Sequence, residues 1–157
     1  MNKLLICYFS ATGTTKEVAE KLSEIINGDL FEIKPVKPYT SEDLDWTNKQ
    51  SRTSLEYADP SIRPEISSNI TNIDKYNKII VCFPVWWYKE PNIIDTFFEN
   101  NNITNQEVYI YVTSGGSGVK ESFESLKTKY PTINFISGKR LSSSNINEFE
   151  IINWLNN

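Results

Sequence analysis

The stretch LLICYFSATGTTKEVAEKL, residues 4–22, decides the fold of this chain. It begins with an apolar run over residues 4–9, which has the length and composition of a buried β-strand. The run ends at SATGTT, residues 10–15, which contains four hydroxyl groups, one glycine and no charge. A helical pattern follows at once, with Val18 and Leu22 on one face. Strand, short polar loop and helix in this order form the first part of a βαβ unit.

The same alternation continues along the chain. The apolar runs are continuous rather than alternating, which indicates parallel strands buried on both faces by helices. We therefore predict one α/β domain over 1–157, an open, doubly wound, five-stranded parallel sheet with helices on both faces. Strands are expected at 3–9, 30–34, 78–83, 107–113 and 133–137, and helices at 14–27, 91–100, 119–130 and 146–155.

A long polar connection, residues 35–76, separates the second and third expected strands and contains four of the seven prolines. The pattern favours a helix over 41–58 and irregular chain elsewhere. Loops of this length are usually functional or disordered. The favoured interpretation is a solvated connection; the alternative is that it reaches over a site at the sheet edge with Trp46, Arg52, Tyr57 and Arg63.

Composition excludes several classes of function. The chain has no histidine, which removes catalytic triads and imidazole metal sites. A formal net charge of -4 makes nucleic acid a poor partner. Cys7 and Cys82 lie inside apolar runs and are expected to be reduced thiols in the core, so no metal site is predicted. The sequence has neither a signal-peptide pattern nor an apolar segment of about 18 residues, so we expect a cytoplasmic protein without a membrane partner.

Residues 10–15 are predicted to bind a phosphate. They offer hydroxyl donors, unpaired backbone amides and the positive end of a helix dipole. The loop lacks the lysine of a nucleotide P-loop, the three glycines of a dinucleotide fingerprint and the arginine of a cysteine phosphatase. Binding by neutral donors, without reaction at the phosphate, is the remaining interpretation. The alternative is that the hydroxyls only cap the helix, for which one would suffice.

Two further loops are expected at the same edge of the sheet, where open α/β sheets bind ligands. CFPVWWYKEP, residues 82–91, ends the third strand with three consecutive aromatic residues, of which at least one should be exposed. Such a side chain can stack on a planar ring, or it can cover the core rim or an interface. TSGGSG, residues 113–118, follows the fourth strand, and its glycines allow close approach of the backbone to a ligand.

Together these motifs resemble those of the flavodoxins, small FMN-binding proteins, over essentially the whole chain. SATGTT matches the phosphate loop, PVWWY is similar to the loop with a flavin-stacking aromatic, and TSGGSG is similar to the second ring loop. The resemblance implies the strand order 2-1-3-4-5 and FMN as cofactor. The residues it implies for cofactor binding are Ser10, Thr12, Gly13, Thr14, Thr15, Pro84, Val85, Trp86, Trp87, Tyr88, Ser114, Gly115, Gly116, Ser117 and Gly118, with no catalytic side chain.

The sequence departs from the family pattern in three ways. The second ring loop has no tyrosine, which leaves one flavin face more open; the first ring loop has no glycine; and the net charge is only mildly acidic. We expect an electron carrier between redox partner proteins. The alternatives are a small NAD(P)H-dependent FMN reductase acting on quinones or nitroaromatics, and a ligand-binding module without redox activity.

Overall fold

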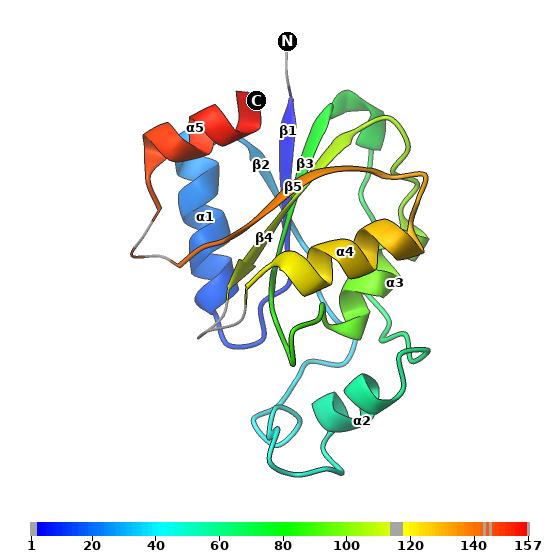
Figure 1. Cartoon of the computed structure of the whole chain (residues 1–157). Coiled ribbons are helices and arrows are strands. Elements are labelled where there is room, and N and C mark those ends of the chain that lie inside the picture. The colour runs from blue at the N-terminus through cyan, green and yellow to red at the C-terminus, as the bar shows by residue number, and fades with distance from the viewer. Residues whose placement is uncertain (1–2, 114–117, 143, 145, 157) are drawn as a thin grey trace.

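The computed structural model describes residues 3–113, 118–142, 144 and 146–156. Its centre is a five-stranded sheet in which every pairing is parallel, with the order β2-β1-β3-β4-β5 (Figure 1). The predicted fold class and strand order are confirmed. The strands are β1 (Leu4–Tyr8), β2 (Asp29–Glu32), β3 (Lys78–Pro84), β4 (Glu107–Thr113) and β5 (Asn134–Arg140).

Helices cover both faces of the sheet. In Figure 1, α1 and α5 lie on one side of the strands, and α3 and α4 lie on the other. The remaining α-helix, α2, lies in the long connection. A short 3-10 helix at Ile73–Lys75 follows it. The α-helices are α1 (Thr14–Ile26), α2 (Arg52–Ala58), α3 (Asn92–Asn100), α4 (Lys120–Lys129) and α5 (Glu148–Asn156).

The continuous apolar runs are explained by two separate cores. Along β1, Leu5 and Cys7 belong to the core beneath α3 and α4, whereas Ile6 and Tyr8 belong to the core beneath α1 and α5. Successive strand residues point to opposite faces, so a strand buried on both sides must be apolar at every position. Cys7 and Cys82 are both free and buried, one in each core, and burial raises the pKa of both thiols.

The largest differences from the expected boundaries lie in the fifth strand and in the long connection. The fifth strand does not end at residue 137, as expected, but continues to Arg140. A Cβ on Gly138 would lie 2.8 Å from the Val119 side chain; glycine therefore lets the segment leading into α4 pack closely on the strand. The helix expected over 41–58 forms only over α2, because residues 40–51 fold as consecutive turns closed by hydrogen bonds such as Leu44 N to Thr40 O.

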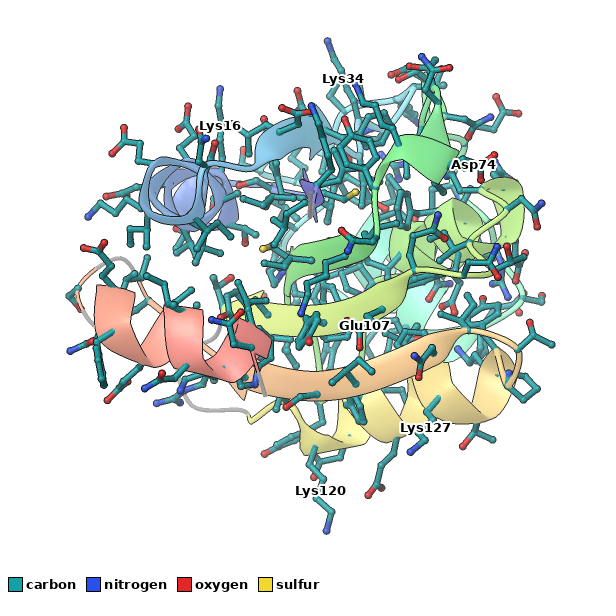
Figure 2. The ribbon with its side chains drawn as sticks, turned by 90° about the horizontal axis from the view of Figure 1, so that it is seen from above. Lys16, Lys34, Asp74, Glu107, Lys120 and Lys127 are labelled. Atoms are coloured by element: carbon teal, nitrogen blue, oxygen red, sulfur yellow. The ribbon has the colours of Figure 1, made fainter. Side chains whose placement is uncertain are left out.

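The long connection lies beyond the carboxyl ends of the strands, where α2 projects from the layered body (Figure 1). Figure 2 views the molecule along the perpendicular direction, with Lys120 and Lys127 pointing outward from α4. No helix in the described part of the chain is long and apolar enough to cross a bilayer.

Candidate functional site

A cleft of about 360 Å³ lies at the carboxyl edge of the sheet, between the ends of β1, β3 and β4 and the long connection. This volume is within the range of pockets that bind small molecules and cofactors. The described residues that line it carry no ionisable side chain. They are Ala11, Thr12, Thr14, Thr15, Leu44, Trp46, Thr53, Pro84, Val85, Trp86, Trp87 and Thr113.

The first wall of the cleft is the loop between β1 and α1. Gly13 has φ 98° and is the N-cap of α1, a left-handed conformation that costs a glycine little. The backbone amide of Gly13 donates to Ser10 Oγ at 3.0 Å, so Ser10 fixes the shape of the loop. Thr12 and Thr14 are exposed and line the cleft beside the start of the helix. The hydroxyl of Ser10 thus closes the turn, and the residues that carry two others line the cleft.

The fourth hydroxyl of this loop joins it to the end of β4. Thr15 is 2% exposed, and its Oγ1 lies 2.8 Å from Thr113 Oγ1, which is also buried. A hydroxyl has one donor and two acceptor positions, so this bond leaves each group further capacity. Thr15 therefore ties two of the predicted loops together in addition to lining the cleft.

The second wall is the turn that follows β3. Trp86 N donates to Lys89 O at 3.0 Å and Lys89 N donates to Trp86 O at 3.1 Å, which closes a two-residue turn. Its central residues, Trp87 and Tyr88, have φ 49° and 68°. Positive φ at both positions is the pattern of a type I′ turn, which normally contains asparagine and glycine. Here bulky side chains adopt it, at a cost of roughly 1–2 kcal/mol per residue.

The three consecutive aromatic side chains take three different directions. Trp86 makes edge contacts with Phe9 and Tyr39, at ring-centroid distances of 5.8 and 5.6 Å, and so covers the core rim. The ring of Trp87 lies 4.8 Å from that of Tyr57. Tyr88 is 60% exposed. Trp86 and Trp87 line the cleft, whereas Tyr88 is not among its lining residues.

The third wall comes from the long connection. Residues 41–50 are mostly exposed, as expected of a solvated connection, but the segment also reaches the cleft. Leu44, Trp46 and Thr53 line the cleft. Leu44 and Thr53 were not predicted; the only available signal was the position of a long loop at the ligand-binding edge. Of the four residues considered in this segment, Trp46 alone lines the cleft, and Tyr57 supports Trp87 from behind the lining.

Arg52 anchors this segment. Its Nε donates to Glu56 Oε2 at 3.0 Å and its Nη1 donates to the Lys37 carbonyl at 2.7 Å. The guanidinium also lies 3.7 Å from the centre of the Tyr39 ring, and Tyr39 OH donates to Glu56 Oε1 at 2.6 Å. Arg52 thus positions the wall without touching the cleft. Arg63 pairs with Glu99 at 3.0 Å instead, so the two arginines do not meet over the cleft.

A buried charged cluster lies directly after the turn. Glu90 is 5% exposed and accepts from Lys129 Nζ at 2.9 Å, while Lys129 also lies 3.3 Å from Asp95. The other oxygen of Glu90, Oε1, is buried and has no hydrogen-bond partner among the described residues. Burial is the main cause that raises the pKa of Glu90 to about 7, and the negative charge of Asp95 is the second. The positive charge of Lys129 lowers this pKa but does not outweigh them.

The predicted second ring loop can be placed only in part. Ser114, Gly115, Gly116 and Ser117 lie outside the described residues. Thr113 lines the cleft, whereas Gly118 is exposed and is not among the lining residues.

FMN fits the donor set of this cleft. Threonine hydroxyls at a helix N-terminus suit a phosphate, and the tryptophan rings suit a planar aromatic system. Gly13 leaves the loop backbone uncovered, because a Cβ built there would have nothing within 4 Å. Thr12 and Thr14 would lie at the phosphate, and Trp87 would lie against the ring.

Comparison with known proteins gives the same family. The flavodoxin family profile matches residues 3–157. A candidate flavoprotein from Bacteroides eggerthii is 44% identical, with a TM-score of 0.95 and coverage of 99% of this chain and 97% of that one. Another from Bacteroides uniformis is 37% identical, with a TM-score of 0.91 and 99% coverage of both chains.

A flavoprotein from Lactobacillus acidophilus in complex with FMN shares the fold at 24% identity, with a TM-score of 0.77 and 99% coverage of both chains. Among curated proteins none matches significantly. The match of the family profile to nearly the whole chain shows that this protein belongs to the flavodoxin family.

Proposed function

We propose that this protein binds FMN in the cleft and transfers electrons between redox partner proteins. The observation that carries the proposal is the meeting, in one cleft, of the hydroxyl loop at the start of α1 and the aromatic turn after β3. Membership of the flavodoxin family and the FMN complex of the L. acidophilus protein support the choice of ligand. When bound, the isoalloxazine ring of FMN accepts and donates the electrons.

In this proposal the residues of the chain bind FMN and orient it. The hydroxyls of Thr12 and Thr14, with the first amides of α1, would donate to the phosphate at the positive end of the helix dipole. Trp87, supported by Tyr57, would pack against the ring. No described lining residue can donate or accept a proton as an acid–base catalyst, which favours a carrier over an enzyme whose protein groups take part in chemistry.

A second function, a small NAD(P)H-dependent reductase of quinones or nitroaromatics, is favoured by one observation. The long connection lines the cleft, and a wall above the ring plane can form a substrate site. Anaerobic reduction of the FMN-loaded protein distinguishes the two. Rapid direct oxidation of NADH or NADPH supports the reductase, whereas reduction only after addition of a separate flavodoxin reductase supports the carrier.

The phosphate assignment is tested with Thr14→Val. Loss of a hydrogen bond to a charged group is expected to weaken FMN binding roughly tenfold or more, whereas riboflavin, which lacks the phosphate, should bind as to the wild type. Titration calorimetry measures both affinities. Thr104→Val is a matched control, because Thr104 is exposed and precedes β4, at the other edge of the sheet. Equal loss of FMN and riboflavin binding in Thr14→Val would contradict the assignment.

A further inference from the structure

Trp46 is a largely exposed aromatic residue in the wall of the cleft. It lines the cleft, yet 71% of its surface is exposed. Trp86 and Trp87, which line the same cleft, are only partly exposed. When a planar apolar group covers a large aromatic side chain that is otherwise open to water, the contact is stabilising.

Hydrogen bonds within the chain hold the backbone around Trp46. Asp45 Oδ1 accepts from Thr47 N at 3.0 Å, so the residues on both sides of Trp46 form one closed turn. Thr53 N and Thr53 Oγ1 both donate to the Asp43 carbonyl, at 3.1 and 2.8 Å, which attaches this turn to α2. The exposed side chain is thus displayed by an ordered main chain, and ordering costs little on binding.

The loop that follows β4 in the sequence contributes no aromatic side chain. Residues 114–118 contain only serine and glycine. We propose that Trp46 supplies the aromatic contact to the isoalloxazine ring that this loop lacks. The inference rests on the proposed function and adds to it a specific role for the long connection: Trp46 is a binding residue for the ring, and Arg52 positions it through Asp43.

Binding of FMN and of lumiflavin, the ring without ribityl phosphate, tests this role. Trp46→Ala should weaken both ligands by a similar factor, roughly tenfold, because the lost contact is to the ring. It should also raise the fluorescence of bound flavin, since a stacked indole quenches it. Trp46→Phe should restore most of the affinity. Thr14→Val gives the opposite pattern, with FMN weakened and lumiflavin unchanged.

Leu55→Ala is the matched control. Leu55 is exposed in the same connection and is not among the residues that line the cleft, so its replacement should leave both affinities unchanged. Thermal unfolding of each variant tests whether the replacement leaves the fold intact. If the wild type binds FMN and Trp46→Ala binds both ligands with unchanged affinity and fluorescence, this inference is overturned and the proposed function stands. If the wild type binds no flavin, the proposed function falls, and the inference with it.

Discussion

The loop over residues 10–15 and the turn over residues 86–89 both depend on left-handed backbone, and they obtain it in different ways. In the loop, glycine occupies the position with φ 98°. In the turn, Trp87 and Tyr88 occupy φ 49° and 68° although no glycine is present. The loop carries no charge, whereas the turn is followed immediately by the buried carboxyl of Glu90.

The difference separates two ways of building a binding wall. A phosphate needs backbone amides, so the loop gains by having the smallest residue and no strain. An aromatic ring needs side-chain area, so the turn keeps bulky residues in a conformation that costs free energy. Contacts of the surrounding structure, such as the Tyr57 ring on Trp87, compensate for this cost.

Glu90, directly after the turn, gives the largest expected effect on stability. Because the folded-state pKa of Glu90 is raised from 4.5 to about 7, the folded protein binds more protons than the unfolded chain between these values. The contribution of Glu90 to stability is therefore complete below about pH 4.5 and is lost as the pH rises through about 7. Over this range the free energy of unfolding falls by at most about 1.4 kcal/mol per pH unit. Glu90→Gln should remove this slope. Urea unfolding at pH 5, 6, 7 and 8 measures it, and parallel curves for both proteins would contradict the assignment.

Gly13→Val tests whether the loop depends on its glycine. A β-branched residue at φ 98° is a strong outlier, and we expect a loss of about 2 kcal/mol in the free energy of unfolding together with a large loss of FMN affinity. Chemical denaturation and FMN titration give the two values. Gly118→Ala is the control: a Cβ there meets nothing within 4 Å and its φ lies outside the left-handed region. Equal effects of the two substitutions would show that neither stability nor FMN affinity depends on the left-handed conformation of the loop.

Strain in the turn predicts a smaller effect of opposite sign. Tyr88→Gly and Tyr88→Ala both remove an exposed ring, but only glycine relieves the left-handed strain at φ 68°. The glycine variant should be more stable than the alanine variant by about 1 kcal/mol, part of which is offset by the greater freedom of glycine in the unfolded chain. Thermal unfolding of the pair measures the difference. If alanine is the more stable replacement, the turn is not strained at this residue.

Much of the fold follows from local sequence. Runs such as KIIVCF, residues 78–83, are long enough and apolar enough to identify strands buried on both faces, and the order of strands and helices then restricts the topology. The extension of the fifth strand through Gly138 could not be predicted, because glycine is a poor strand former and its reason for being there is Val119, distant in sequence.

Only those residues of the candidate site that belong to a sequence motif could be predicted. Thr12 and Thr14 stand out by their composition and by the helix that follows them. Leu44, Trp46 and Thr53 reach the cleft because Arg52 joins Lys37, Asp43 and Glu56, contacts that no periodicity records. A turn with positive φ at two bulky residues is likewise invisible to turn rules, which expect glycine or asparagine.

The absence of ionisable groups among the described lining residues has a consequence for encounters with other proteins. Without a lysine or arginine at the cleft to neutralise it, a bound phosphate ester adds about two negative charges to a chain whose own formal net charge is -4. In the proposed function, the flavin-loaded form is therefore the more strongly anionic species, and a cationic partner surface would approach it faster at low ionic strength than the empty form.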